Sequence, residues 1–441
     1  MNMLFNKVYV ITSPELVRGV QRSHHALSLN PLFTRTAESV GGIKGPGVEL
    51  LGVKDHDLGH RVVAAMRPTL LGEGLDHINS TMINCLQTIV QDLKTQATDN
   101  VFDLYDWCTS AMTLASTDAI YGPRNPYQKE SVRKAYWEIE KNLSVLMTDV
   151  LPWLTARKAW QGREHLANAF LQFYQANGHM ESSQLAYIRW KVQTDGGASL
   201  EDTARLEAVM GLGILSNTVP SSFWLLFDIF SRPELLAEIR TELHQNAVST
   251  TADTGAHTVD LADIRDKCPL LLASFQETLR LRSNSAQLRV IHEDTIIGGS
   301  YLVKKGSILV MPAAVINKNK SAWGSDATSF DPARFMGLGD DKRRKSSAFM
   351  SFGVSPNICA GRHFATGEIL ALAAMLILQF DLHPAGGHWV EPPTNVKAVA
   401  ASLSPPASQT WVTIAKRHES RGVKWHFQVT PGKGRYGLIS G

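Results

Sequence analysis

SFGVSPNICAGRHFATGEILALAAMLILQF, residues 351–380, places one cysteine between an irregular loop and a long apolar helix. The loop carries Gly353 and Pro356, turn residues that can hold a loop in a shape that points a side chain at a ligand. Cys359 comes just before the predicted helix, where the helix dipole and the unpaired backbone N–H groups favour thiolate over thiol. A single thiolate held in this way suits a metal ligand, and in particular the axial position of a haem iron.

The composition describes an ordinary globular protein with a large core. Of the 441 residues, 44% are hydrophobic and 19% are charged, a length that allows one large domain or two or three smaller ones. The net charge of +3 is too small to favour a nucleic-acid partner. The four cysteines form neither a CxxC pair nor a zinc-binding spacing, so the sequence favours a reducing compartment over a disulfide framework. They are Cys85, Cys108, Cys268 and Cys359.

Hydrophobic periodicity predicts a mostly helical chain with a few strands. Residues 57–180 carry apolar side chains at three- and four-residue intervals, which is typical of helices. Residues 9–17 predict a strand that leads into a helix. Alternating apolar residues predict further strands within residues 283–291, 300–315 and 410–417.

Three segments lack such a pattern. Residues 30–58, with a cluster of glycines between positions 41 and 47, predict a loop-rich segment. Residues 247–260 are polar and predict a flexible surface loop. Residues 418–441 receive no assignment.

The segment Ser199–Phe230 predicts a long buried helix with a bend. Ser199, followed by two acidic residues, is a helix-start signal. Apolar residues surround the helix instead of forming one stripe, which is typical of a helix buried on all sides. Pro220 removes a backbone hydrogen bond, so we expect a bend near Ser216, where polar residues cluster. A polar patch inside a buried helix is costly unless it meets water or a ligand.

A second helix, opened by Pro269, carries Glu277 and Arg280 three residues apart on one face. Such a pair is either a solvated surface bridge of little energetic value or, between apolar runs such as those that flank it here, a buried pair. Loss of one partner of a buried pair would be strongly destabilising.

The pattern F-G-x-S-x-N-x-C-A-G-R-x-F-A, residues 352–365, resembles the cysteine loop of the cytochrome P-450 family. Ser355 stands where the family usually has glycine. Asn357 stands where it usually has arginine or histidine, a usual partner of a haem propionate. The E-x-x-R pair and a downstream D-P-x-R-F segment, residues 331–335, follow the family's pattern and order.

The resemblance implies the P-450 fold, which is mainly α with small β-sheets, in one large helical domain over residues 1–441 with a minor β-rich lobe. It also implies haem b, iron-protoporphyrin IX, with Cys359 as the axial thiolate. Glu277, Arg280 and Arg334 then form a folding lock beneath the haem. Because Asn357 replaces a usual propionate partner and the helix at residues 59–68 lacks the family's tryptophan, we expect Arg289 to carry more of the pairing with the propionates. The other expected cofactor-binding residues are Phe352, Gly353 and Gly361 in the cysteine loop and His60, Arg61 or Arg67 in that helix.

The bent helix resembles the helix that crosses the oxygen-binding face of the haem in this family. Ser216 and Asn217 stand where most members have an acid and a threonine. The pattern Asn-Thr-x-Pro-x-x-Phe-Trp is similar to a subgroup that includes bile-acid-forming sterol hydroxylases and prostacyclin synthase. Asn217 cannot act as a general acid, but it can orient a water molecule or hydrogen-bond dioxygen. We therefore predict catalytic roles for Asn217, Ser216 and Thr218, and a substrate pocket that includes Leu215, Ser285 and Ala286.

The implied function is that of a monooxygenase that uses dioxygen, and electrons from NADPH delivered by a reductase, to oxidise a hydrophobic small molecule of fungal secondary metabolism. An alternative is a haem-thiolate isomerase or dehydratase that needs no external oxygen. A third alternative is a haem-binding protein without turnover. The basic run Lys342–Lys345 is a candidate docking site for an acidic electron donor.

We expect a monomer with peripheral membrane contact and no nucleic-acid partner. The first 20 residues contain neither a signal-peptide apolar region nor the ~20 apolar residues of a membrane span. The expected location is the cytoplasmic side of the endoplasmic reticulum if an anchor was removed, and otherwise the cytoplasm.

Overall fold

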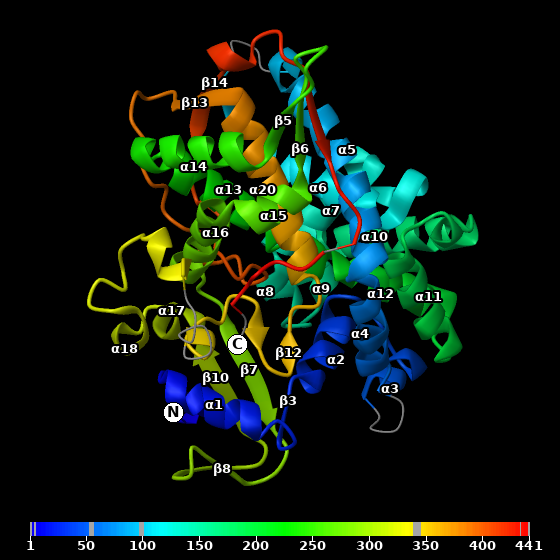
Figure 1. Cartoon of the computed structure of the whole chain (residues 1–441). Coiled ribbons are helices and arrows are strands. Elements are labelled where there is room, and N and C mark those ends of the chain that lie inside the picture. The colour runs from blue at the N-terminus through cyan, green and yellow to red at the C-terminus, as the bar shows by residue number, and fades with distance from the viewer. Residues whose placement is uncertain are drawn as a thin grey trace.

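The computed structural model describes residues 2–3, 6–52, 57–96, 101–337, 345–432 and 434–439. Helices make up most of the described chain, and a five-stranded sheet lies with the N-terminal helix at one end of the molecule (Figure 1). The last described residues, 434–439, cross to the middle of the face that Figure 1 shows. The prediction of a mainly helical fold with small sheets is therefore confirmed.

The helices carry most of the core. They are α1 Pro14–Arg22, α2 Asn30–Ser39, α3 Pro46–Gly52, α4 Leu58–Thr69, α5 Gly72–Gln96, α6 Leu104–Tyr121, α7 Glu130–Lys141, α8 Leu143–Leu146, α9 Pro152–Thr155, α10 Arg157–Gln175, α11 Gln184–Asp195, α12 Leu200–Ile214, α13 Thr218–Phe230, α14 Pro233–Asn246, α15 Leu261–Lys267, α16 Pro269–Arg282, α17 Ala313–Ile316, α18 Lys320–Trp323 and α20 Arg362–Gln379. Short 3-10 turns lie at Gly122–Arg124, Pro126–Gln128, Gly178–Met180, Pro332–Phe335 and His418–Ser420.

The strands form several small sheets. They are β1 Asn2–Met3, β2 Asn6–Val10, β3 Leu27–Ser28, β4 Val101–Asp103, β5 Val248–Thr250, β6 His257–Asp260, β7 Ala286–Ile291, β8 Thr295–Ile297, β9 Tyr301–Val303, β10 Ile308–Pro312, β11 Gly353–Val354, β12 Asn357–Ile358, β13 Phe380–Pro384, β14 Trp411–Lys416 and β15 Trp425–Gln428. The five-stranded sheet has the order β1-β2-β10-β7-β3, with β10 parallel to β2 and antiparallel to β7. The strands predicted near residue 9 and within residues 283–291, 300–315 and 410–417 are all present.

Two helices, α13 and α20, lie at the centre of the helical part. Every residue of α13 is buried, and Leu370–Leu378 of α20 are at most 1% exposed. The apolar residues on all sides of these two helices therefore pack against surrounding parts of the fold, as the sequence predicts. By length and composition the span Leu200–Phe230 could cross a membrane, but 67% of its most apolar window is buried inside the fold.

The predicted bend interrupts the long helix between α12 and α13, at residues 215–217. Pro220 has no N–H to give to the carbonyl of Ser216, which ends the regular hydrogen-bond ladder at this point. The helix start is also confirmed, because the hydroxyl of Ser199 accepts a bond of 3.0 Å from the backbone N–H of Asp202.

The prediction of a loop-rich segment over residues 30–58 is wrong for most of its length. Residues 30–39 and 46–52 form α2 and α3. The glycines mark only the connection between these helices, where Gly42 and Gly45 have φ of 71° and 57°. Residues 53–56 lie outside the described part of the chain.

The prediction of a flexible loop over residues 247–260 is also wrong for half of that segment, because Val248–Thr250 and His257–Asp260 are strands. β5 and β6 pair with each other, and β6 pairs in parallel with β15 from the segment that received no assignment. β5 pairs only with the neighbouring β6, whereas β6 also takes a partner distant in sequence, which local periodicity does not reveal.

Candidate active site

A tight hairpin presents Cys359 to the interior. β11 pairs with β12, and the backbone N–H of Cys359 donates to the carbonyl of Phe352 at 2.8 Å. Gly353 has φ of 91°, and a Cβ atom there would lie 2.5 Å from the carbonyl oxygen of Asn357. Only glycine therefore allows the two strands of this hairpin to close.

The sulfur of Cys359 lies at the start of α20, as the sequence predicts. Burial raises the pKa of the Cys359 thiol, while backbone N–H groups of Gly361 and Arg362 and the charge of Arg362 act in the opposite direction. Coordination to a metal ion would remove the proton altogether. The donor set at the helix start therefore suits a thiolate ligand.

Cys359 combines burial with exposure. Surrounding protein desolvates its sulfur, yet the residue is exposed, and we infer from this combination that the side chain borders a cavity. In the central helix, Gly213 is exposed and Asn217 is partly exposed, although Leu215 and Ser216 between them are buried. Gly213 and Asn217 are four residues apart, so one face of the interrupted helix opens to space inside the fold.

Arg289 provides a buried positive charge beside the hairpin. Its side chain is 2% exposed, and its guanidinium donates to the carbonyl of Val354 at 3.0 Å and to that of Leu288 at 2.7 Å. Burial lowers the pKa of Arg289 to about 10, so the group remains charged at neutral pH. No carboxylate among the described residues forms an ion pair with it. A buried cation without a counter-charge is costly, and a carboxylate of a bound ligand would relieve that cost.

The far wall of the site comes from three separate segments. The Oδ1 atom of Asn217 accepts a bond of 2.7 Å from the backbone N–H of Ser402. The hydroxyls of Ser402 and Ser285 are 2.9 Å apart. Ser283 in turn contacts Ser351, just before the hairpin, at 2.9 Å. Hydrogen bonds from the segment 283–285 therefore reach both the Ser402 contact of the bent helix and the residue before the cysteine loop.

Known proteins with similar sequences have one family in common. The sequence matches the family described as Cytochrome P-450 over residues 2–410. The chain belongs to the cytochrome P-450 family. It is 44% identical to the cytochrome P-450 monooxygenase nodJ of Hypoxylon pulicicidum, with 100% of this chain and 87% of that protein aligned. It is 27% identical to a cytochrome P-450 monooxygenase of Gibberella zeae, over 96% and 82% of the two chains. Cholesterol 7-alpha-monooxygenase of Cricetulus griseus is 23% identical, over 79% of this chain and 74% of the relative.

The residues of this P-450 fit the haem that the family implies. One exposed sulfur in a cavity can supply a single axial ligand, and among the described residues no group of three or more His, Cys, Asp or Glu could hold a metal ion without a porphyrin. Arg289 provides an unmatched positive charge for a propionate. Phe352 and Gly353 lie in the hairpin, and Gly361 precedes the first helical residue of α20.

The three basic residues predicted from the helix at 59–68 have different surroundings in the P-450. His60 is exposed, and its Nδ1 atom lies within hydrogen-bond distance of Asp57 and Asn30. These contacts engage one ring nitrogen, and cofactor binding by His60 stays a prediction. Arg61 is exposed, whereas Arg67 donates to the carbonyl of Pro356 in the cysteine loop at 3.3 Å. Of the three, only Arg67 has a hydrogen bond to the cysteine loop.

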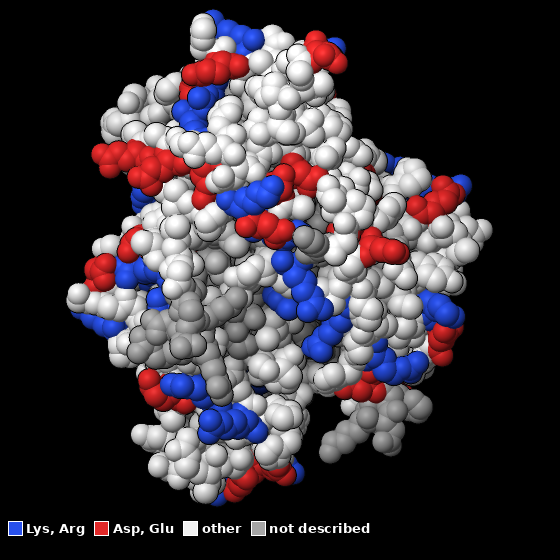
Figure 2. All heavy atoms as spheres, in the orientation of Figure 1, with Lys and Arg blue, Asp and Glu red and all other residues white. Residues whose placement is uncertain are grey.

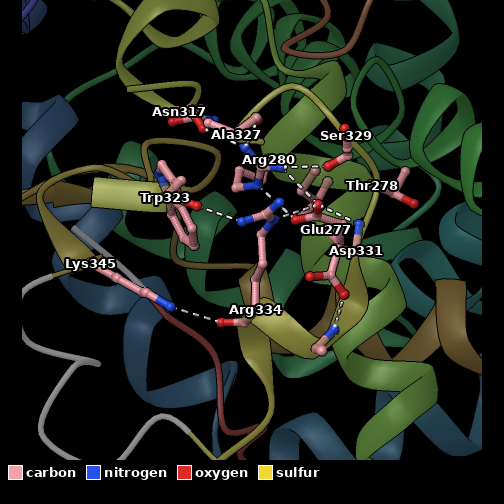
Figure 3. A network of polar contacts seen from close by, with 12 residues as sticks. Glu277, Thr278, Arg280, Asn317, Trp323, Ala327, Ser329, Asp331, Arg334 and Lys345 are labelled. Atoms are coloured by element: carbon pink, nitrogen blue, oxygen red, sulfur yellow. Dashed lines mark hydrogen bonds and ion pairs between the residues drawn. The ribbon is translucent and has the colours of Figure 1, made fainter. Parts of the chain in front are cut away.

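The lock residues are joined as the sequence analysis expects (Figure 3). Arg280 donates two bonds of 2.7 Å to the two carboxylate oxygens of Glu277, and both side chains are fully buried. Nε of Arg334 lies 3.5 Å from Oε1 of Glu277. Arg280 also donates to the carbonyls of Asn317 and Ala327. Asn317 accepts the backbone N–H of Met350 at 2.9 Å, so the lock is tied to the chain that leads into the hairpin.

Other predicted residues of the central helix face the core. Leu215 is 0% exposed and Ser216 is 1% exposed, and the Ser216 hydroxyl lies 2.8 Å from that of Tyr136. Thr218 donates to the carbonyl of Ile214 at 2.9 Å. These contacts correct the placement of Leu215 in the pocket and of the Ser216 and Thr218 hydroxyls beside the reacting groups. Asn217 remains as the partly exposed member of the set.

The basic run before the cysteine loop is described only at Lys345. Its Nζ atom donates to the carbonyl of Arg334 at 3.1 Å, so it supports the lock instead of projecting freely. The predictions for Lys342, Arg343 and Arg344 lie outside the described residues.

Glu368 is a buried acid that the sequence analysis missed. It lies on α20, is 1% exposed, and accepts a bond of 2.6 Å from the hydroxyl of Ser116 on α6. Burial raises the pKa of Glu368 to about 8, while bonds from Ser116 and Thr218 lower it in part. A glutamate in an otherwise apolar helix is the sequence signal that could have identified it.

Proposed function

We propose that this P-450 uses dioxygen, and electrons passed from NADPH by a reductase, to oxidise a hydrophobic small molecule of fungal secondary metabolism. The observation that carries the proposal is the position of Cys359, in a cavity at the start of a buried helix and beside the unmatched charge of Arg289. Fungal relatives named as cytochrome P-450 monooxygenases support the reaction class. When bound, haem would supply the oxidising chemistry.

The chain's own residues would bind the cofactor and position the substrate. Cys359 would ligate the iron, and Arg289 would pair with a propionate. Ser285 and Ala286 lie at least partly exposed where the lock helix ends and β7 begins, so they are candidates for substrate contact. The surrounding cavity would exclude bulk water from the reacting groups.

Asn217 would orient water near the site. Its Oδ1 atom is occupied by the Ser402 N–H, which fixes the amide and leaves Nδ2 as the donor for another group. An amide does not release a proton at neutral pH, so protons would come from water or from a substrate hydroxyl. Asn217 would therefore help the delivered electrons to yield product by positioning water, and not by donating a proton.

Peripheral membrane contact, as a monomer on the cytoplasmic side of the endoplasmic reticulum, is part of the proposal. Supporting it, the segment from α8 to α9 exposes several large apolar side chains to solvent. They are Val145, Met147, Val150, Leu151, Trp153 and Leu154.

The test begins with the purified, haem-loaded protein. Reduction under carbon monoxide should give the absorption band of a thiolate-ligated haem. With a P-450 reductase and NADPH, a screen of hydrophobic terpenoids, steroids and polyketides should reveal compounds that shift the haem spectrum and are oxidised. Product that forms without reductase and without oxygen would replace the proposal with an isomerase or dehydratase, which the amide at Asn217 would suit. A reduced protein without the thiolate band would refute both.

A further inference from the structure

The helix that carries the lock ends in another arginine with a buried partner. Arg282 is the last residue of α16, and it donates to both carboxylate oxygens of Asp228 on α13, at 2.9 and 2.6 Å. Thr278, one turn earlier on α16, donates to the same carboxylate at 3.0 Å. The side chain of Asp228 is 0% exposed and that of Arg282 is 12% exposed. This pair is therefore shielded from water, as the pair of Glu277 and Arg280 is.

The burial of Asp228 distinguishes this contact from ion pairs at the surface. Figure 2 shows basic and acidic side chains that adjoin one another on the surface of the visible face. Such exposed pairs fix geometry weakly, because water competes for both partners. Arg282 makes one of them, to the exposed Glu391 at 3.0 Å, and Asp228 also accepts from the partly exposed Arg232 at 3.1 Å. The contact of Arg282 with Asp228 holds the guanidinium most firmly, because separation would leave a buried carboxylate without its closest partner.

The guanidinium of Arg282 also covers the ring of Trp224 on α13. Its central carbon lies 3.9 Å from the ring centroid, and Trp224 is 0% exposed. A guanidinium this close to an indole is held by cation–π attraction and by stacking. The indole N–H of Trp224 donates to the backbone carbonyl of Ser404 at 2.8 Å. The arginine therefore fixes the ring, and the ring in turn holds residue 404.

Ser404 belongs to the wall of the site that contains Asn217. The backbone N–H of Ser402, two residues earlier, donates to the Oδ1 atom of Asn217 at 2.7 Å. The backbone N–H of Asn284 donates to the carbonyl of Ser402 at 2.8 Å, and its side chain donates to the hydroxyl of Ser404. Asn217 and Trp224 are seven residues apart, about two turns of helix. One helix therefore contacts both ends of the segment 402–404.

The thiolate wall contains a matching arrangement on the other side of α16. The guanidinium carbon of Arg280 lies 5.1 Å from the ring centroid of Trp323, and both residues are drawn in Figure 3. The indole N–H of Trp323 donates to the backbone carbonyl of Ala348 at 3.1 Å. Each arginine of α16 thus joins a buried acid to a tryptophan that holds a backbone carbonyl. The two arrangements differ in the wall that they reach.

We propose that Arg282, Asp228 and Trp224 form a second lock, which positions the segment 402–404 against Asn217. The three are positioning residues, because their contact with Asn217 passes through the backbone of Ser402. The second lock keeps the Ser402 N–H on the Oδ1 atom of Asn217 and so keeps the Nδ2 atom oriented as a donor. Its effect on turnover rests on the proposed function, in which Asn217 orients water.

The first experiment measures hydrogen–deuterium exchange in the haem-loaded full chain. Trp224→Phe keeps an aromatic ring beneath Arg282 but removes the indole N–H. Exchange of the peptide that contains Ser402 should become about two- to ten-fold faster, as expected for the loss of one hydrogen bond. Trp323→Phe is the matched control, because it removes the corresponding N–H in the thiolate wall. It should leave exchange at Ser402 unchanged.

Arg282→Lys tests the same lock without a change in the tryptophan, and it decides the question where Trp224→Phe does not fold. Lysine keeps a positive charge for Asp228 but lacks the planar group that bonds two oxygens and stacks on a ring. Exchange at Ser402 should again be faster than in the parent protein. Parent-like exchange in either folded variant, or an equal increase in Trp323→Phe, would overturn the proposal.

The second experiment measures the hydrogen peroxide released per NADPH in the presence of a P-450 reductase. Trp224→Phe should raise this ratio, and the double variant with Asn217→Ala should match Asn217→Ala alone, because the tryptophan acts through the asparagine. Additive increases would overturn positioning through Asn217. The exchange experiment needs no turnover. A parent protein without the thiolate band would therefore refute the proposed function, while exchange at Ser402 would still decide the second lock.

Discussion

The two walls of the site are built in different ways. The thiolate wall is one continuous stretch, in which the hairpin of β11 and β12 leads directly into α20. The opposite wall joins Asn217, Ser285 and Ser402 through single hydrogen bonds between distant segments. The difference teaches that the candidate metal ligand is held by local backbone geometry, whereas the candidate substrate wall depends on tertiary contacts.

This contrast predicts unequal tolerance to substitution. The thiolate wall rests on fully buried charged groups, such as the pair Glu277 and Arg280. The opposite wall has partly exposed polar groups that water can satisfy. Substitutions in the thiolate wall should abolish haem binding or folding, whereas substitutions in the opposite wall should alter the reaction.

The largest effect is expected at the sulfur. Cys359→His should eliminate the thiolate-type band of the reduced carbon-monoxide complex, because imidazole does not donate electron density as a thiolate does. Cys85→Ala is the control and should keep the band, since Cys85 lies on α5 and bonds Asp118 at 3.5 Å. A band that survives Cys359→His would show that another residue binds the iron.

Removal of a lock residue should cost stability next. Arg280→Ala leaves the carboxylate of Glu277 buried without its main partner, and we expect a loss of about 3–5 kcal/mol in the free energy of unfolding. Lys191→Ala removes the exposed pair with Asp195 and should cost less than about 1 kcal/mol. Denaturant titration of both variants checks the contrast, and equal losses would contradict a buried lock.

Glu368 is a buried acid on α20 of the thiolate wall and should give a pH signature. Because burial raises the pKa of Glu368 to about 8, the folded protein keeps a proton that the unfolded chain releases near pH 4.5. Stability contributed by this group therefore falls as pH rises from 4.5 to 8, by at most about 1.4 kcal/mol per pH unit. Glu368→Gln should remove this decline and make the protein more stable than the parent at pH 8.

Thermal unfolding from pH 5 to pH 8 measures that effect. The exposed Glu234 offers a control, because Glu234→Gln should leave the parent's pH profile unchanged. A Glu368→Gln profile parallel to that of the parent would mean that Glu368 ionises alike in the folded and unfolded states.

The smallest effect is expected at the opposite wall. Asn217→Ala should fold and keep the thiolate band, but it should release more hydrogen peroxide per NADPH, by about tenfold or less, because the oriented amide is lost. Ser402→Ala keeps the backbone N–H that Asn217 binds and should change this ratio less. An unchanged ratio of product to electrons in Asn217→Ala would exclude a positioning role.

Prediction from the sequence succeeded where the interacting residues are close together in the sequence. The bend near Ser216 follows from Pro220 a few residues away, and the pair of Glu277 and Arg280 follows from helical spacing. Arg334 could be added only through resemblance to a family. Glu368 was missed because its partner Ser116 lies on another helix, 252 residues earlier in the chain.

The sequence by itself indicated the candidate metal ligand, the buried helices and the family, because turn residues, periodicity and motif order act within short stretches. Only the tertiary structure decided that the polar segment at residues 247–260 contains strands. Asp260 on β6, for example, accepts a hydrogen bond from Gln428 on β15, which is 168 residues later in the chain. It also decided that Asn217, and not Ser216, borders the cavity, because the packing of Tyr136 takes the serine hydroxyl into the core. Long-range contacts of this kind have no local signal, since they depend on which surfaces meet after the chain has folded.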